Sequence, residues 1–307
     1  MDDAEHIAVL YRALLGREPD APGLSHFLAL AQRHNDLRPV ISGILASEEY
    51  RARTSPPAAE LSPAMRPSRA MTIVDVGAQK LSYEDEVYAP LLRSGAECRC
   101  IAFEPLANRR AEMLAADPNL RVLPFFIGDG SEQTFHINND DSTSSLFPLN
   151  QLLNQHLAGL SHLRTMRTER VATTRLDDAL ADETVVDFLK FDIQGFELPA
   201  LVGAEQVLAR TNVIHCEVML APIYEGQPLF SEVEAHLRAR HFEFIDFSHE
   251  CRYPYAGLTT PERLAWADAV FFRAGTSGDD ARAQAAIAAS IYGKAGLSSL
   301  MLSRLSR

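Results

Sequence analysis

The amino-acid sequence predicts an α/β fold: a doubly wound, mostly parallel seven-stranded sheet, preceded by a small all-α module. The main observation is that, after residue 71, short apolar runs alternate with amphipathic stretches of helical length. Before residue 51, apolar residues recur at helical spacing, and four prolines lie between the two patterns, where they disfavour both helices and central strands. We therefore expect a helical module at 1–50, a Pro-rich linker at 51–71, the sheet domain at 72–275 and a helical tail at 276–307.

Each expected strand is an apolar run that is bounded by turn residues or by a helical stretch. The strands are expected at Thr72–Val76, Arg99–Phe103, Arg121–Ile127, Val185–Phe191, Asn212–Val218, Phe242–Phe247 and Asp268–Arg273. The helices of the sheet domain are expected at Glu84–Ser94, Leu106–Ala116, Glu197–Ala209 and Phe230–Arg240. No clear helix precedes the last strand, so we expect that strand to join the sheet antiparallel.

Composition argues against several classes of function. The 307 residues carry 29 Lys and Arg against 41 Asp and Glu, a formal net charge of −12 without a basic patch, so we expect no nucleic-acid partner. No apolar run approaches the length of a membrane-spanning helix, and the first residues lack a secretory signal, which predicts no transmembrane segment and a cytoplasmic protein. The four cysteines lack the spacing of a zinc knuckle.

The ends of the first two predicted strands have the pattern of an adenosine-binding site. The first strand ends in Asp75 and turns at Gly77, where a missing side chain would let a ligand approach the backbone. Glu104 ends the second strand, and a carboxylate there can accept both hydroxyls of a ribose. The residues expected to bind the cofactor here are Asp75, Gly77, Ala78, Gln79, Glu104 and Pro105. The further glycines that cradle a pyrophosphate are absent, which favours S-adenosylmethionine over NAD.

Later strand ends add polar residues to the same edge of the sheet. Gly128 and Asp129 follow the third strand and could bind an adenine, although Gly-Asp-Gly is also a common turn. Asp192 follows the fourth strand and could bind the cofactor's amino group, bind a metal or accept a proton. His215 and Glu217 share one face of the fifth strand, and either could be the catalytic base, although a histidine in a strand is more often a core residue.

Four longer stretches resemble a known family. They are Val-Asp-Val-Gly-Ala at 74–78, Phe-Glu-Pro at 103–105, Asp-Phe-Leu-Lys-Phe-Asp-Ile-Gln-Gly-Phe-Glu at 187–197, and Tyr-Glu-Gly-Gln-Pro-Leu-Phe at 224–230. These stretches resemble the FkbM family of S-adenosylmethionine-dependent methyltransferases, over about residues 72–250. The resemblance implies a Rossmann-like fold and O-methyl transfer to a hydroxyl of a natural product, sugar or glycan. Residues 79–82 depart from the family's commoner pattern of Asn and a further Gly, so Tyr83 or Glu84 is expected to contribute there.

The first fifty residues resemble a small helical domain of unknown function that recurs in bacterial proteins associated with cell surfaces and polysaccharides. The segments Tyr11–Leu24 and Ser47–Tyr50 carry this resemblance. It implies no chemistry, but it favours a glycan or glycoconjugate among the expected acceptors, which also include a small molecule. A second copy of the chain, in a homo-oligomer, is a further candidate partner.

Other interpretations stay open from the sequence. The polar stretch 140–170 could form a lid over the acceptor or a solvated insertion. The pairs Asp140-Asp141 and Asp177-Asp178 could bind Mg²⁺, although such pairs usually cap turns and helices, so no metal ligand is assigned. In place of a methyltransferase, the chain could be a catalytically degenerate adenosine-binding scaffold or an NAD-dependent sugar-modifying enzyme.

Overall fold

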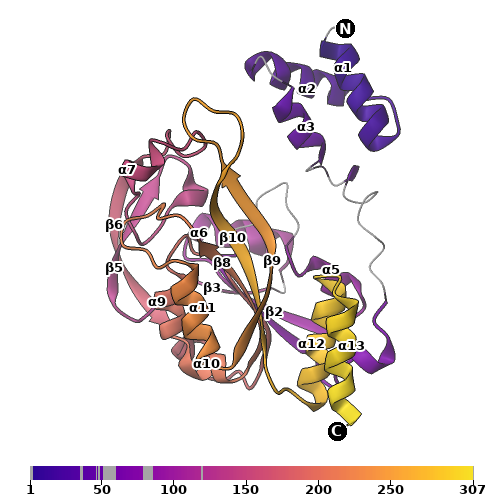
Figure 1. The fold of residues 1–307 in the computed structure, drawn as a ribbon, viewed down its shortest axis with the longest axis vertical. Coiled ribbons are helices and arrows are strands. Elements are labelled where there is room, and N and C mark those ends of the chain that lie inside the picture. The colour runs from indigo at the N-terminus through magenta and orange to yellow at the C-terminus, as the bar shows by residue number, and fades with distance from the viewer. Residues whose placement is uncertain are drawn as a thin grey trace. The chain divides into compact units, whose positions relative to one another are not determined.

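The computed structural model describes residues 3–34, 37–45, 47, 49–50, 60–78, 86–118 and 120–306. Contacts divide the chain into two compact units, residues 1–60 with 80–89 and residues 61–79 with 90–307. The first unit contains α1 (Asp3–Leu10), a π-helical turn η1 (Tyr11–Leu15), α2 (Ala21–His34) and α3 (Arg38–Leu45), as Figure 1 shows. Its buried core is formed by Ile7, Tyr11, Leu15, Ala31, Val40 and Ile44. The small all-α module is therefore confirmed, whereas the bounds of the four predicted segments remain a proposal.

The second unit is built on a seven-stranded sheet, with strand order β3-β2-β1-β7-β8-β10-β9. Its strands are β1 (Met71–Val76), β2 (Cys98–Phe103), β3 (Arg121–Leu123), β7 (Val186–Phe191), β8 (Thr211–Met219), β9 (Phe242–Tyr253) and β10 (Arg263–Arg273). The pairs from β3 to β8 are parallel, and β10 is antiparallel to both β8 and β9. Every residue of β8 is buried, as expected for a central strand that is covered on both faces. The predicted sheet and its antiparallel end are thus confirmed.

The third predicted strand, Arg121–Ile127, differs from the prediction because it is divided between two sheets. β3 ends at Leu123, and Pro124, which has no N–H to donate, separates it from β4 (Phe126–Gly128). β4 joins a second sheet of order β4-β6-β5, with β5 (Glu132–Asn138) and β6 (Thr165–Arg175). β5 and β6 are not among the predicted strands, and the first six residues of β6 are exposed.

Helices cover both faces of the main sheet (Figure 1). One face packs against α8 (Leu176–Ala179), α9 (Glu197–Val202), α10 (Glu205–Ala209) and α11 (Phe230–Arg238). α12 (Gly278–Ser290) contacts β7 and β8 and lies beside α13 (Ala295–Ser303). Two further helices, α5 (Ala89–Arg93) and α6 (Ala107–Ala116), follow β1 and β2. The helix predicted over 197–209 is interrupted at Gly203, where a Cβ would lie 2.1 Å from the carbonyl oxygen of Gly128.

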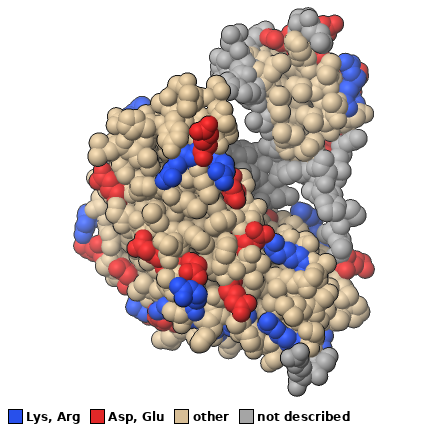
Figure 2. Space-filling model, in the orientation of Figure 1, with Lys and Arg blue, Asp and Glu red and all other residues tan. Residues whose placement is uncertain are grey.

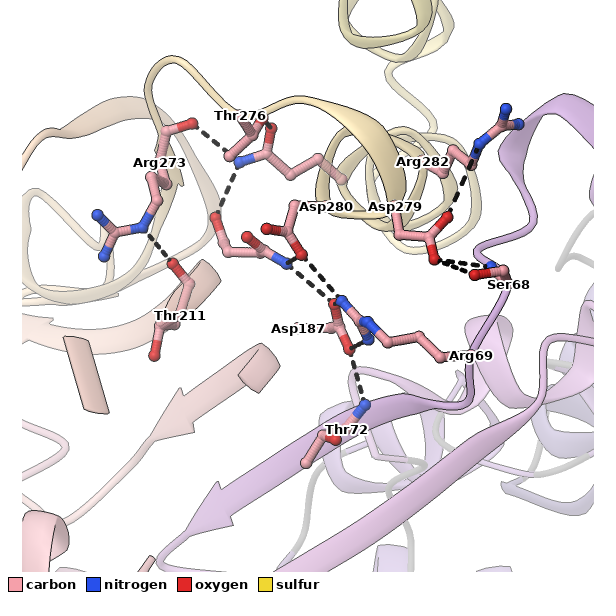
Figure 3. Close-up of polar contacts among 12 residues, drawn as sticks. Ser68, Arg69, Thr72, Asp187, Thr211, Arg273, Thr276, Asp279, Asp280 and Arg282 are labelled. Atoms are coloured by element: carbon pink, nitrogen blue, oxygen red, sulfur yellow. Dashed lines mark hydrogen bonds and ion pairs between the residues drawn. The ribbon is translucent and has the colours of Figure 1, made fainter. Parts of the chain in front are cut away.

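An ion-pair network fastens α12 to the amino edge of the sheet, at the start of the parallel strands (Figure 3). The Arg69 guanidinium donates to both carboxylate oxygens of Asp187, at 2.6 and 2.8 Å, and to Asp280 at 2.9 Å. Asp187 is fully buried and also accepts the backbone N–H of Thr72 at 2.8 Å and the Asn212 amide at 2.9 Å. We call Arg69, Asp187 and Asp280 the amino-edge clasp. It joins the segment before β1, the sheet and the C-terminal helices.

The surface gives two further observations. In Figure 2, acidic and basic side chains are interspersed on the visible part of the described surface, without a large field of one sign.

Within the described ranges, no helix combines the length and the apolar composition that crossing a bilayer requires.

Candidate functional site

The carboxyl edge of β1 lies against the turn that follows β7. The Asp192 N–H donates to the Val76 carbonyl at 3.0 Å, and the N–H groups of Gly77 and Ala78 both donate to the Phe103 carbonyl, at 3.3 and 3.2 Å. Gly77 has φ of +82°, and a Cβ there would lie 1.9 Å from the Asp192 carbonyl oxygen. The glycine is thus required by the approach of two backbones. It brings three predicted site residues, Gly77, Ala78 and Asp192, to one place.

Polar side chains form a row on the sheet face opposite α9 and α11. Strand register pairs Asp75 with Lys190, Lys190 with His215, and Glu217 with Asp268, so these side chains point to the same side. The Lys190 ammonium lies 2.9 Å from Asp75 and 3.9 Å from Asp192. We call this set, with Asp192, the polar row. Predicted residues Asp75, Asp192, His215 and Glu217 belong to it, whereas Lys190 and Asp268 were not assigned to the site from the sequence.

Asp192 and Glu217 differ in their exposure to solvent. The Asp192 side chain is 40% exposed, whereas Glu217 is 5% exposed. Surrounding protein atoms raise the pKa of Asp192 by desolvation, and the nearby Lys190 ammonium counteracts part of that rise. Desolvation, with the charges of Asp192 and Glu197 added to it, raises the pKa of Glu217 well above its usual range. The site thus combines an accessible aspartate with a buried glutamate whose pKa is raised.

His215 is enclosed by partners on both ring nitrogens. Its Nδ1 lies 3.1 Å from the Tyr292 hydroxyl, and its Nε2 lies 3.7 Å from an Asp268 oxygen. The ring stacks on Tyr292 at an interplanar angle of 13° and is 3% exposed. Tyr292 follows α12, so His215 connects the C-terminal helices to Asp268. These contacts fit a positioning residue better than a base that touches the acceptor.

Glu104, the predicted ribose ligand, lies directly after β2. The side chain is 4% exposed, and its Oε1 accepts the Leu106 N–H at 2.7 Å. Within the described residues, no protein hydrogen bond reaches its Oε2. Burial raises the pKa of Glu104, and the Leu106 N–H together with the charges of Arg109 and Arg110 counteracts part of that rise. The neighbouring Pro105 contributes its carbonyl, which accepts from Arg110 at 2.6 Å.

The remaining predicted cofactor residues are not joined to the polar row by contacts among the described residues. Gly128 belongs to β4, where a Cβ would lie 2.8 Å from Thr173 and 3.0 Å from Phe196. Asp129 accepts the N–H and hydroxyl of Ser131 at 3.0 and 2.5 Å, and these bonds lower its pKa. The structure thus shows a turn at 128–131, and adenine binding there stays a prediction. Gln79, with Tyr83 and Glu84, lies outside the described residues.

The acid pairs and the 140–170 stretch have structural partners. Asp140 caps η3 (Asp141–Thr143) through the Ser142 N–H, and Asp141 forms an ion pair with Arg109 of α6. Asp177 accepts the N–H groups of Gln206 and Val207, each at 2.9 Å. Across the described ranges, no group of three His, Cys, Asp or Glu side chains forms a metal-ligand cluster. The stretch also contains α7 (Gln151–Asn154) and enters β6, so it is partly structured.

Gln194 is a site residue that sequence reasoning missed. Its amide Nε2 lies 3.0 Å from Asp192 Oδ1 and 3.2 Å from Glu217 Oε2, and its Oε1 accepts the Tyr224 hydroxyl at 3.0 Å. The Tyr224 hydroxyl also lies 2.9 Å from the Thr143 carbonyl, which links η3 to the site. The sequence signal was Gly195, because a glycine directly after a strand is typical of a turn.

Glu197, the first residue of α9, stabilises the turn that follows β7. Its Oε1 accepts the N–H groups of Ile193 and Gly195 at 2.9 and 3.2 Å. Desolvation raises its pKa from 4.5 to about 7, against the lowering effect of these bonds. Because the folded-state pKa is raised, the folded protein binds this proton more tightly than the unfolded chain does. The contribution of Glu197 to stability is therefore highest at low pH and falls as the pH rises from 4.5 to about 7.

Replacing Glu197 with Gln is expected to remove that pH dependence. Gln can still accept both N–H groups but does not titrate. Relative to Glu197→Gln, the wild type should lose stability between about pH 4.5 and 7, with a slope of at most about 1.4 kcal/mol per pH unit. Urea unfolding at several pH values measures the difference. If the free energies of unfolding of the two proteins change with pH in the same way, burial does not raise the pKa of Glu197.

Comparisons with known proteins bear on what this site does. The model of the Methyltransferase FkbM domain matches residues 75–244, more than half of the chain. A solved FkbM methyltransferase from Methylobacillus flagellatus shares 15% identity and a TM-score of 0.38, over 88% of this chain and 60% of that chain. A TehB-like S-adenosylmethionine-dependent methyltransferase from Corynebacterium glutamicum shares 12% identity and a TM-score of 0.34, over 81% and 98% of the two chains. A search of curated proteins finds no significant match.

The sequence match alone decides the family, because TM-scores of this size add no support. The matched residues begin at Asp75 and end within β9, so they include the edge of β1, Glu104 and most of the polar row. The chain belongs to the FkbM methyltransferase family.

Proposed function

We propose that the chain transfers the methyl group of S-adenosylmethionine to a hydroxyl of a sugar, glycan or other small-molecule acceptor. The observation that carries this proposal is the charge of the polar row, where Asp75 and Asp192 lie 2.9 and 3.9 Å from the Lys190 ammonium and Asp268 adds a third carboxylate on β10. A cofactor that carries a sulfonium and an ammonium complements such a surface. The two phosphates of NAD would face these carboxylates, which argues against a nicotinamide cofactor.

The residues on the two sides of the site fit S-adenosylmethionine. Glu104 has a buried carboxyl whose Oε2 is open to a ribose hydroxyl as far as the described residues show. Asp192 is accessible and lies beside the turn at Gly77, within reach of a cationic group. When bound, S-adenosylmethionine supplies a methyl carbon that is already activated by the positive charge on sulfur. The protein is left with alignment, exclusion of water and acceptance of a proton.

The polar row assigns separate tasks to its members in this proposal. Asp192 accepts the proton of the acceptor hydroxyl, because it combines exposure with a carboxylate that Lys190 stabilises. Glu217, whose pKa is raised by burial, accepts a hydrogen bond from the Gln194 amide at 3.2 Å. His215 positions its neighbours rather than acting as the base, since it is buried, its Nδ1 is paired with the Tyr292 hydroxyl, and its Nε2 faces Asp268 at 3.7 Å.

Glu104→Ala is expected to weaken S-adenosylmethionine binding at least about tenfold. Two ribose hydroxyls would lose a charged acceptor, and hydrogen bonds to charged groups contribute about 1.5–3 kcal/mol. Calorimetric titration of the folded variant measures the change. An unchanged dissociation constant would remove Glu104 from the ribose site.

Thermal stability with separate ligands tests the proposed function itself. A selective ligand raises the melting temperature because it binds the folded state alone. We expect a shift with S-adenosylmethionine and none with NAD at the same concentration. A shift with NAD alone would favour the sugar-modifying oxidoreductase. Binding of S-adenosylmethionine without methyl transfer to any extract would favour a degenerate scaffold.

The acceptor class rests on the N-terminal module, whose sequence resembles domains of polysaccharide-associated proteins. We propose a glycan or glycoconjugate, with the module contributing to its recognition. Incubating the protein and methyl-labelled S-adenosylmethionine with cell-envelope extracts tests this. Label that enters only protein or small lipid-free metabolites would contradict a glycan acceptor.

A further inference from the structure

Gln194 occupies a backbone conformation that a glutamine rarely adopts. Its φ is +56°, and the following Gly195 has φ of +94°. The left-handed region costs a residue with a Cβ about 1 kcal/mol or more, so the surrounding structure must hold it there. The hydroxyl of Ser145 donates to the Gln194 carbonyl at 2.6 Å, and Glu197 accepts the Gly195 N–H at 3.2 Å. The strain is therefore maintained at the carboxyl end of β7, inside the candidate site.

The strained backbone directs the Gln194 side chain between two carboxyl groups. The amide Nε2 donates to Asp192 Oδ1 at 3.0 Å and to Glu217 Oε2 at 3.2 Å. The orientation of the amide is set from its other end by the hydroxyl of Tyr224, which is 1% exposed and 3.0 Å from Oε1. One amide thus holds an exposed acid, a buried acid and a tyrosine in a fixed relation.

Charges from every neighbouring element act on this arrangement. Asp75 lies on β1, Lys190 on β7, Glu197 on α9 and Asp268 on β10, in addition to Asp192, Glu217 and Tyr224 themselves. Two carboxylates that share a site repel each other, so ionising one of them opposes ionisation of the other. A neutral donor between them stabilises a carboxylate without adding charge. The Gln194 bond accordingly lowers the pKa of Asp192, against the larger effect of desolvation.

We propose that Gln194 is a positioning residue whose amide holds Asp192 and Glu217 in a fixed relation and orients the Asp192 carboxylate for the cofactor and the acceptor. The inference rests on the proposed function, because it assigns Asp192 to the cationic cofactor and the acceptor proton. The proposed role also accounts for the left-handed conformation of Gln194, because this conformation places the side-chain amide between Asp192 and Glu217.

The experiment measures S-adenosylmethionine affinity by calorimetry between about pH 5 and pH 9, so it needs no knowledge of the acceptor. For the wild type, we expect affinity to fall as Asp192 takes up a proton at low pH. Gln194→Glu places a third carboxyl between the pair and should move that transition upwards by about one pH unit or more. The cofactor's own amino group titrates identically in every variant, so differences from the wild type report the protein.

Two further variants separate positioning from folding. Gln194→Asn tolerates the left-handed backbone well but is too short to reach both acids. It should keep the wild-type melting temperature and still show the displaced pH transition. Tyr224→Phe keeps the glutamine and removes the hydroxyl that orients it, so a smaller shift in the same direction is expected. Gln206→Glu, on the exposed face of α10, adds the same charge away from the site and should change nothing.

The possible failures are distinguishable. Folded Gln194→Glu and Gln194→Asn proteins that bind with the wild-type pH dependence would overturn the inference and leave the proposed function intact. A wild-type protein that does not bind S-adenosylmethionine at any pH would overturn the proposed function, and the inference with it. If Gln194→Glu does not fold, the Asn and Phe variants decide the matter alone.

Discussion

Asp192→Asn is expected to lower turnover by about 10²- to 10⁴-fold, the usual contribution of a general base. Asparagine keeps the volume and can still accept from Gln194, but it cannot take a proton from the acceptor. The rate of label transfer from S-adenosylmethionine measures the effect, and calorimetry separates its cause. Retained affinity with lost turnover indicates a role on the acceptor hydroxyl, whereas lost affinity indicates a role on the cofactor's positive charge.

Asp182→Asn is the matched control, since Asp182 is exposed on the loop before β7 and outside the polar row. It should retain wild-type turnover and affinity. If Asp192→Asn behaves like Asp182→Asn in both measurements, Asp192 only shapes the turn after β7, and the centre of the proposed site is wrong.

Arg69→Ala is expected to destabilise the sheet unit by about 3–5 kcal/mol, because it leaves a fully buried carboxylate without its cation. Asp187 would keep the Thr72 N–H and the Asn212 amide, which do not neutralise its charge. Asp280 would lose its link to the segment before β1. The free energy of unfolding in urea measures the loss.

Two comparisons make the result specific. Arg238→Ala breaks an exposed ion pair with Glu234 and should cost less than about 1 kcal/mol. The double variant Arg69→Ala, Asp187→Asn removes both charges and should be more stable than Arg69→Ala alone. Equal losses for Arg69→Ala and Arg238→Ala would mean that solvent reaches Asp187 and compensates it.

The main sheet could be predicted because its central strands are buried on both faces, so they appear in the sequence as continuous apolar runs. β5 and β6 could not be predicted in this way. The stretch 165–170 is Thr-Met-Arg-Thr-Glu-Arg, and its side chains are exposed although its backbone pairs with β5, so it contains no apolar run that would reveal a strand. The predicted strand 121–127 is divided at Pro124. The predicted helix 197–209 is interrupted at Gly203 because the Gly128 backbone approaches it there, and such a tertiary contact cannot be read from the sequence.

The candidate site was predictable where it follows from topology alone. Asp75, Glu104 and Asp192 end neighbouring parallel strands, and such ends meet at one edge of a sheet. Gln194, Tyr224 and Asp268 could not be assigned, because their roles depend on a turn conformation, a loop and an antiparallel register. His215 and Glu217 do share one face of β8, as their spacing predicts. The contact of His215 with Tyr292, however, joins residues 77 positions apart and could not be read from the sequence.

The amino-edge clasp also has a consequence for how the chain matures. Arg69 is separated from Asp187 by 118 residues and from Asp280 by 211. During synthesis on a ribosome, β1 therefore emerges long before Asp187 and Asp280. Until these two residues have been synthesised, the Arg69 guanidinium lacks the carboxylates with which it pairs in the folded protein. Contacts of such long separation slow folding and leave sheet edges exposed in the interval. We expect nascent chains that end before α12 to be retained by chaperones, and release to coincide with the emergence of Asp280.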